Sequence, residues 1–211
     1  MPTNMVHVNQ WLTELQAQIA AQPGETWTVA RMKLVYPDSD SRRGTVGIDT
    51  VSAAGACNAT ATNALFNEAL GRITIQATFS NFELRGESKL IGPFRILLQN
   101  GKSAIGRFRQ RYAHELWPIS GEWEVPFRVE SALGALIPRP SEPPVLLKSA
   151  EPGEFAIPPI GSWFEKWDPI SLVDENDPEG PTIAIVEHAM HVMLNIGSAP
   201  AIPAFYSAGK W

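Results

Sequence analysis

The sequence predicts an α+β, β-rich fold, built on an antiparallel sheet or sandwich of which a jelly roll is one arrangement. Two or three helices and a long proline-rich C-terminal arm complete this prediction. Three observations lead to it. Several segments alternate strictly between apolar and polar residues, which is typical of half-buried antiparallel strands. A few short segments space their apolar residues as helices do. Finally, 12 of the 18 prolines lie in residues 135–211.

Three segments have the pattern of helices. In residues 8–21 the apolar residues recur every three or four positions, and a Pro-Gly pair ends the pattern. Residues 58–70 begin at an asparagine that suits an N-cap and stop at a glycine. Residues 103–116 begin at a serine cap and carry an apolar stripe. The sequence therefore predicts helices over these three ranges.

Alternation predicts the strands, and two positions mark irregularities in them. The phase of the alternation flips at Asn81, where we expect a β-bulge or the end of a strand. Pro126 lacks a backbone N–H, which argues for an edge strand around it. The predicted strands are 26–36, 44–52, 72–80 and 122–129, and the first two form a hairpin with a long loop.

The change in composition near residue 134 predicts two unlike parts. Residues 1–134 form the mixed, β-rich core domain. Residues 135–211 form an extended arm that packs over this core or over a neighbouring subunit. One regular element returns from the arm at 182–196. Its β-branched start favours a strand, while alanine and methionine in its middle keep a helix open.

Charge is distributed unevenly along a chain whose formal net charge is only −5. Residues 1–134 carry 13 basic and 12 acidic side chains, a net charge of +1, and residues 135–211 carry 4 and 10, a net charge of −6. A basic patch falls in 85–111 and an acidic one in 165–179. The small overall charge conceals these two patches.

The basic patch is the candidate contact site. Arginine binds phosphate bidentately and stacks on bases, so contact with RNA is one interpretation. Pairing with the acidic segment, within the chain or between subunits, is the other, and the sequence leaves both open. On the predicted helix, Arg107 and Arg111 share a face. The residues predicted for nucleic-acid or inter-subunit contact are Arg107, Arg109, Arg111, Lys102 and Arg95, and those of the acidic partner patch are Asp174, Glu175, Asp177 and Glu179.

Catalytic, metal and cofactor motifs are missing from the sequence. It contains no Gly-x-Ser-x-Gly elbow, no P-loop and no Gly-x-Gly-x-x-Gly run. His188 and His191 share a face only on a helix, and no third ligand follows at a recognisable spacing. The single Cys57 cannot form an intramolecular disulfide. We therefore predict no catalytic residue, no metal site and no cofactor.

Two stretches resemble the coat proteins of filamentous plant RNA viruses. One is Arg-Gln-Arg-Tyr-Ala at 109–113, followed by Trp117, and the other is Ala-Leu-Ile-Pro-Arg-Pro-Ser-Glu at 135–142. In addition, Val-Tyr-Pro-Asp-Ser-Asp at 35–40 resembles the hairpin turn of rod-shaped virus coats. Those coats are mainly helical, so a β-rich capsid subunit fits the strand pattern better. The resemblance implies a viral structural protein that contacts RNA.

Together these observations predict a structural, self-assembling subunit, most plausibly the coat or capsid protein of a virus or phage. Its expected partners are other copies of itself and RNA, with no membrane. Its expected place is the virion or host cytoplasm, or otherwise the cytoplasm as a soluble protein. The alternative is a carbohydrate- or small-ligand-binding module or a hydrolase, which would use the tryptophans Trp117, Trp123, Trp163 and Trp167 and the carboxylates Glu122 and Glu124. Its expected site is a concave cleft lined by Trp123 and Trp163 with a carboxylate at its floor.

Overall fold

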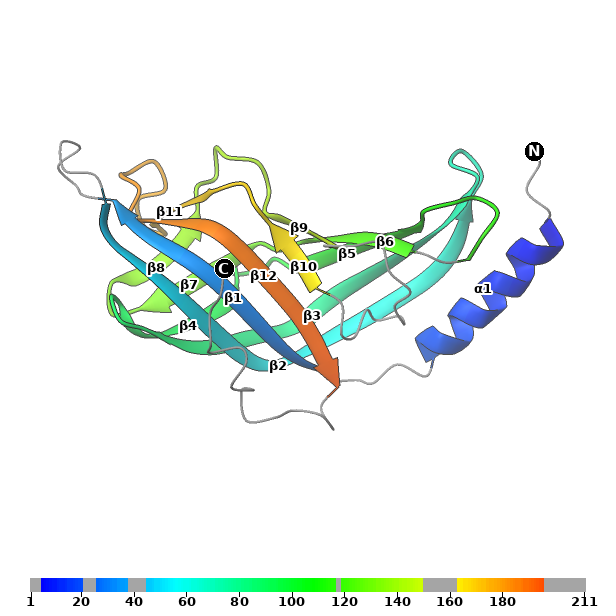
Figure 1. Ribbon diagram of the computed structural model, residues 1–211, viewed down its shortest axis with the longest axis horizontal. Helices are drawn as coiled ribbons and strands as arrows, with labels where there is room; N and C mark the ends of the chain where they lie inside the picture. Colours follow the sequence, from blue (N-terminus) through cyan, green and yellow to red (C-terminus); the bar gives the residue numbers. More distant parts are fainter. Residues whose placement is uncertain (1–4, 21–25, 38–44, 117–118, 150–162, 196–211) are drawn as a thin grey trace.

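The computed structural model describes residues 5–20, 26–37, 45–116, 119–149 and 163–195 (Figure 1). No helix in these ranges is long and apolar enough to cross a membrane. The described residues form the helix α1 (Met5–Ala20) and twelve strands: β1 (Thr26–Pro37), β2 (Thr45–Asn67), β3 (Arg72–Ser88), β4 (Gly92–Leu98), β5 (Ala104–Gln110), β6 (Ile119–Glu124), β7 (Phe127–Ser131), β8 (Gly134–Pro138), β9 (Leu146–Ser149), β10 (Trp163–Lys166), β11 (Ile170–Asp174) and β12 (Ala184–Asn195).

The twelve strands form one antiparallel sheet that closes on itself. β1 pairs with β2 on one side and with β12 on the other, which joins the two ends of the sheet (Figure 1). β4 and β5 lie one after the other along β3, and β11 and β10 lie in the same way along β12. β7 and β6 pair with β8 and β9. Counted as interrupted single strands, these pairs give an eight-stranded up-and-down barrel.

Glycine and proline explain why four of the eight strands are interrupted. Gly101, with φ of 72°, lies between β4 and β5. Proline cannot donate to a strand ladder, and Pro126 and Pro169 stand between β6 and β7 and between β10 and β11. Three prolines lie between β8 and β9. Backbone bonds such as Gln99 N–H to the Pro126 carbonyl (2.8 Å) join neighbouring interruptions, which form one row across the barrel wall.

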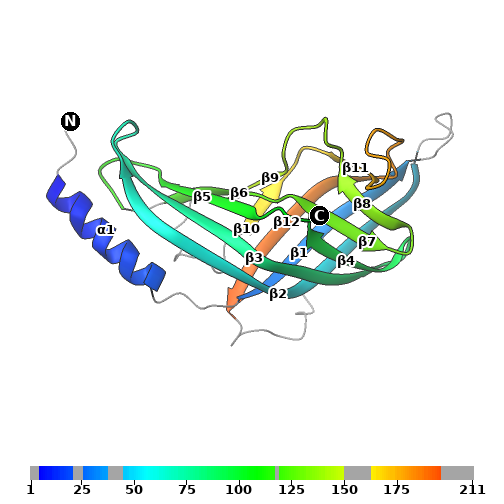
Figure 2. The same ribbon diagram turned by 180° about the vertical axis from the view of Figure 1, so that it is seen from behind.

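The helix α1 packs against β2 near the hairpin that joins β2 to β3 (Figures 1 and 2). Val8 and Leu15 are buried, and Trp11 and Ile19 pack on the core from the same face. The helix predicted over 8–21 is therefore confirmed. Its apolar stripe is buried against the barrel, which provides most of the stability of a helix of this length.

An aromatic cluster fills the barrel where β3, β5, β6 and β10 meet. The rings of Phe79 and Trp123 lie 4.2 Å apart, and Phe108 contacts Trp123 edge-on with the centroids 5.4 Å apart. Two of these aromatic residues lie opposite glycines on the neighbouring strand: Trp123 pairs with Gly106, and Phe108 pairs with Gly121. A Cβ on Gly121 would lie 2.0 Å from Cδ1 of Phe108. These glycines leave the space that the aromatic rings occupy.

The predicted α+β fold with two or three helices is wrong, because α1 is the single helix of the described residues and nearly all the rest is strand. Residues 58–70 belong mostly to β2, and 103–116 contain β5. Their small residues misled the prediction. Ala59 and Ala61 face the barrel interior, where the aromatic cluster leaves little room, so alanine replaces the larger apolar residues that usually mark a strand.

The strand predicted over 122–129 is divided at Val125 and Pro126 into β6 and β7. The edge strand predicted around Pro126 is wrong, because β6 pairs with β5 and β9, and β7 pairs with β4 and β8.

The remaining strand predictions agree with the structure. β1, β2 and β3 begin as expected, and β2 opposes β1 as the predicted hairpin. The phase flip at Asn81 is a bulge, since Cys57 pairs with Phe82 while Ala59 pairs with Phe79. The segment 182–196 is the strand β12, and the helical alternative is excluded. Much of the described part of 135–211 supplies β8 to β12, which belong to the same barrel wall as β1 to β7.

We expect Gly121→Ala to destabilise the protein by about 3 kcal/mol, because the added methyl overlaps the Phe108 ring in a packed core. Glycine-to-alanine changes at open strand positions stabilise instead, since they reduce the entropy of the unfolded chain. Chemical denaturation measures the difference. A second change, Phe108→Leu, should recover part of the loss, whereas Ser120→Ala on the outward side should change the unfolding free energy by less than about 0.5 kcal/mol. A neutral Gly121→Ala would contradict the packing described here.

Candidate functional site

An apolar cavity lies inside the barrel, beside the aromatic cluster. Its volume is about 40 Å³, roughly the space of one water molecule. A void without polar partners does not retain water, so this cavity is dry. It is lined by residues of both long and interrupted strands, with no charged side chain among them: Ala30, Met32, Phe82, Leu84, Ile96, Val125, Phe127, Val145, Leu147, Ala189 and Met190.

The indole of Trp123 stands next to this cavity. Trp123 pairs across the sheet with Leu147 and precedes Val125, just past the end of β6, by two residues, and both Leu147 and Val125 line the cavity. The ring is fully buried, and among the described residues its Nε1 has no hydrogen-bond partner. Cζ3 approaches Gly106, and Nε1 is bonded to the ring carbon opposite Cζ3, so the N–H points away from β5. The indole N–H of Trp123 is therefore a buried donor that lacks an acceptor among the described residues.

A separate polar cluster occupies the barrel interior at the turn from β3 to β4. The buried carboxylate of Asp49 accepts hydrogen bonds from the Ser88 hydroxyl (2.7 Å) and from the Lys89 backbone N–H (2.8 Å). Burial raises the pKa of the nearby Tyr36, the Ser88 side chain opposes that effect, and the Asp49 charge adds to it. Asp49 and Ser88 hold each other and the turn in place, which accounts for the burial of these two side chains without a ligand.

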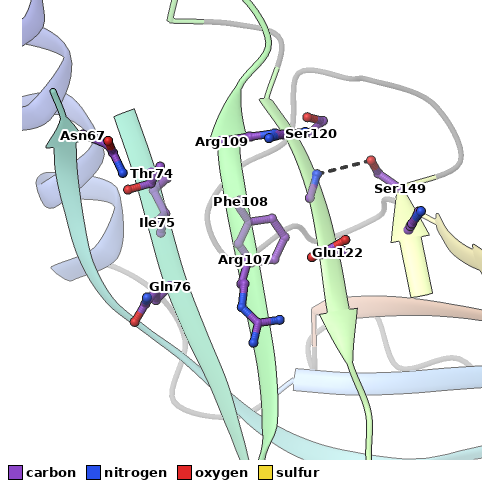
Figure 3. A pocket seen from close by; sticks show the side chains of 12 residues that line it. Asn67, Thr74, Ile75, Gln76, Arg107, Phe108, Arg109, Ser120, Glu122 and Ser149 are labelled. Atoms are coloured by element: carbon purple, nitrogen blue, oxygen red, sulfur yellow. Dashed lines mark hydrogen bonds between the residues drawn. The ribbon is translucent and has the colours of Figure 1, made fainter. Parts of the chain in front are cut away.

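On the outer face of the wall, β3, β5, β6 and β9 form a shallow polar pocket of about 540 Å³ (Figure 3). In Figure 3, Arg109 extends toward Ser120, and Arg107 extends in a different direction. Arg107 donates to the Glu124 carboxylate at 3.0 Å. The Gly121 backbone N–H donates to the hydroxyl of Ser149 at 3.3 Å. The pocket is lined by Asn67, Thr74, Ile75, Gln76, Arg107, Phe108, Arg109, Ser120, Gly121, Glu122, Lys148 and Ser149.

The strand register arranges the outward side chains of this pocket in two rows. One row runs from Arg107 through Glu122 and Lys148 to Glu165, and its charges alternate in sign. Opposite charges on neighbouring strands stabilise a sheet modestly. The other row places Arg109 between Thr74 and Ser120, which are neutral. Of the described residues, no carboxylate makes an ion pair with Arg109.

Beyond β9, the outer face carries an exposed aromatic residue. Trp167 is 68% exposed, stacks on His188 with the ring centroids 4.0 Å apart, and donates from Nε1 to the Glu165 carboxylate at 2.8 Å. Burial lowers the pKa of His188, and the Glu165 charge, 4.0 Å from Nε2, acts in the opposite direction. The covering indole thus keeps an imidazole away from water on the outside of the barrel.

One solved structure has a similar fold. It is described as the structure of DynF from the dynemicin biosynthesis pathway of Micromonospora chersina. The TM-score is 0.65 at 17% identity, and the match covers 82% of this chain and 79% of that one. At this identity the similarity establishes the fold alone. No family model and no curated protein sequence matches this chain.

The structure brings together only part of the predicted basic site. Arg107 and Arg109 line the same outer pocket, because alternate residues of a strand share a face. The prediction from a helix, which paired Arg107 with Arg111, is wrong. Arg111 follows β5 and lies over the Tyr112 ring. Lys102 lines a different pocket, at the row of interruptions, and Arg95 on β4 pairs with Glu130.

The acidic patch lies in the part of the wall formed by β4, β7, β8 and β11, at the point where β11 leads into β12. Glu175 binds Arg128 at 3.1 Å, while Asp174 accepts from the Asn176 backbone N–H at 2.8 Å. Asp177 and Glu179 lie in the loop that follows. Arg95 and Arg107 instead bind carboxylates of their own region of the sheet. Whether these patches contact RNA or another subunit stays a prediction.

The carboxylates and tryptophans of the predicted alternative site are divided between two faces. Trp123 is buried inside the barrel, whereas Glu122 and Glu124 lie on the outward side of the same strand, so they cannot line one cleft. Trp117 and the side chain of Trp163 lie outside the described residues, as does the side chain of His191. The described part contains no group of three histidine, cysteine or acidic residues able to hold a metal ion.

Sequence reasoning missed the interior cavity. Its signal was present in the inward alternation of Ala30 and Met32 on β1 and of Leu84 and Ile96 farther along the chain. Each strand alone reveals an apolar face, but the shared cavity follows only from closing the sheet. Trp167 and His188 are far apart in sequence, and their contact depends on the pairing of β10 with β12.

We expect His188 to titrate below its ordinary value of 6.5, because burial disfavours the imidazolium. Its contribution to stability is then complete above about pH 6.5 and is lost as the pH falls through the lower folded-state pKa. NMR titration gives the pKa, and denaturation at several pH values gives the stability. His188→Gln should reduce the acid-dependent loss, whereas the matched change at His114, whose side chain is 76% exposed, should leave it unaltered. A His188 pKa at or above 6.5 would contradict the burial argument.

Proposed function

We propose that the protein binds a small apolar molecule inside the barrel. The observation that carries the proposal is the apolar cavity beside the unpartnered indole N–H of Trp123. An eight-stranded barrel has an interior just wide enough to be filled by side chains or to hold one small ligand. Here the aromatic cluster fills one part, and the cavity leaves the other part incompletely packed.

The energetics of the cavity and of the indole favour a ligand. A residual void of 40 Å³ costs about 1 kcal/mol in a protein core. A buried donor without an acceptor costs a further 1–3 kcal/mol or so. A molecule with an apolar body and one hydrogen-bond acceptor offsets both costs. Such a molecule exceeds the present void, and the two methionines of the wall, Met32 and Met190, whose side chains have three rotatable bonds, are the residues best able to move aside.

The similar structure is compatible with this proposal. DynF is described as a protein of a biosynthesis pathway, and a barrel that shields an apolar compound from water has an obvious use in such a setting. Self-assembly into a coat, which the sequence predicts, is a different function. It stays a prediction, as does RNA binding by the basic residues.

We expect the neutral fluorophore N-phenyl-1-naphthylamine to bind with increased emission and to be displaced by small aromatic ketones. The displacement follows because ketones supply both an apolar body and an acceptor for Trp123. Titration followed by fluorescence gives the affinity, and native mass spectrometry of the purified protein shows whether a compound copurifies. The proposal would be contradicted if the probe shows no saturable binding and no compound copurifies with the protein.

We expect Ala30→Val to block this binding, because the two added methyl groups occupy the cavity. The same change should raise the unfolding free energy by up to about 1 kcal/mol, the cost of the void. Ala54→Val, on the outward side of β2, is the matched control and should bind the probe normally. Probe affinity that is equal in both variants would place the probe elsewhere and refute the interior site.

A further inference from the structure

We propose that Arg109 is the centre of an anion-binding site on the outer face of the barrel, for the phosphate or carboxylate group of a small, hydroxyl-bearing molecule. The site is the pocket of about 540 Å³ in Figure 3, a volume in the usual range for small-molecule sites. It is separate from the interior cavity and does not depend on it.

The charge pattern of the wall singles out Arg109. In the neighbouring row every charge has an opposite partner across the strand, from Arg107 to Glu122 and from Lys148 to Glu165. Arg107 additionally binds Glu124 at 3.0 Å. Arg109 has neutral residues on both sides. A guanidinium presents a planar fork of donors that matches a carboxylate or phosphate, and this fork is unoccupied by any carboxylate of the described residues.

The other polar groups of the pocket are held ready to donate. The side-chain oxygen of Asn67 accepts from the Leu70 backbone N–H at 3.1 Å, which orients its NH₂ group as a remaining donor. The oxygen of Ser149 accepts from Gly121, which leaves its hydroxyl hydrogen available. Ser120 lies directly across from Arg109 on the neighbouring strand, and the Arg109 side chain extends toward Ser120 (Figure 3). Anions are bound through such charge-assisted hydrogen bonds.

The same geometry favours a small molecule over RNA. Nucleic-acid binding at useful affinity takes several phosphate contacts, about 6–10 in strongly salt-dependent cases. The basic residues of this region do not form a track, because Arg95 is held by Glu130 and Lys102 lines another pocket. Glu122, at the edge of the site, disfavours a second acidic group nearby and can accept from a ligand hydroxyl.

The test is NMR titration of the full chain with inorganic phosphate and, separately, with acetate, in a buffer of low ionic strength. The resonances of Gln110, Ser120 and Gly121 should shift and saturate with at least one of these probes. Arg109→Gln should lower the affinity about tenfold or more, the effect of losing a charged hydrogen bond. Arg85→Gln is the matched control, since it removes the same charge from an exposed arginine that pairs with Glu83 and lies outside the pocket, and it should retain the site.

Three outcomes would overturn the proposal. The first is shifts that spread over all basic residues without saturation. The second is equal losses in Arg85→Gln and Arg109→Gln, which would indicate a response to net charge alone. The third is tight binding of a uridine decamer that Arg109→Gln weakens, together with no response to either small anion, which would assign the surface to RNA. Both arginines are exposed, so neither variant is expected to impair folding.

Discussion

The pairing of β1 with β12 is the interaction on which the rest of the structure depends. It joins the first strand to the last along ten registered residue pairs and turns an open sheet into a barrel. With it, each of the twelve described strands has a neighbour on both sides, so backbone groups find partners without a protected edge. It also defines an inside, because the apolar faces of β1, β3 and β12 meet only when the sheet is closed. The cavity beside Trp123 exists because of this closure.

The second constraint is the row of interruptions at Gly101, Pro126, Pro169 and the prolines between β8 and β9. They divide one side of the wall into two tiers, β4–β7–β8–β11 and β5–β6–β9–β10, while β1, β2 and β3 remain long. β3 changes partner from β5 to β4 at its bulge, and β12 changes from β11 to β10. The high proline content is thus compatible with a continuous sheet, because the prolines stand where the strand ladders are already broken.

The sequence indicated the local structure where apolar and polar residues alternate, as in β1 and the first half of β3, and where α1 has an apolar stripe. It failed where the inward residues are small. Ala59 of β2 pairs with Phe79, Gly106 with Trp123 and Gly121 with Phe108, so that packing comes from residues on other strands. Local pattern cannot show it. Of the predicted basic residues, only Arg107 and Arg109 line one pocket, because the prediction assigned their faces from a helix whereas this segment is the strand β5.

The strand β5 contributes residues both to the aromatic cluster inside the barrel and to the polar pocket on its outer face. Gly106 and Phe108 face inward and shape the aromatic cluster, while Arg107 and Arg109 face outward and shape the polar pocket. The period of two assigns the residues to opposite faces, so the aromatic cluster and the polar pocket each draw on their own half of the same seven residues. β6 repeats the division, with Gly121 and Trp123 inward and Ser120 and Glu122 outward. Because the wall is one peptide layer thick, a change that displaces the Phe108 ring also moves the backbone that carries Arg109. The packing of the core therefore fixes the geometry of the outer site as well.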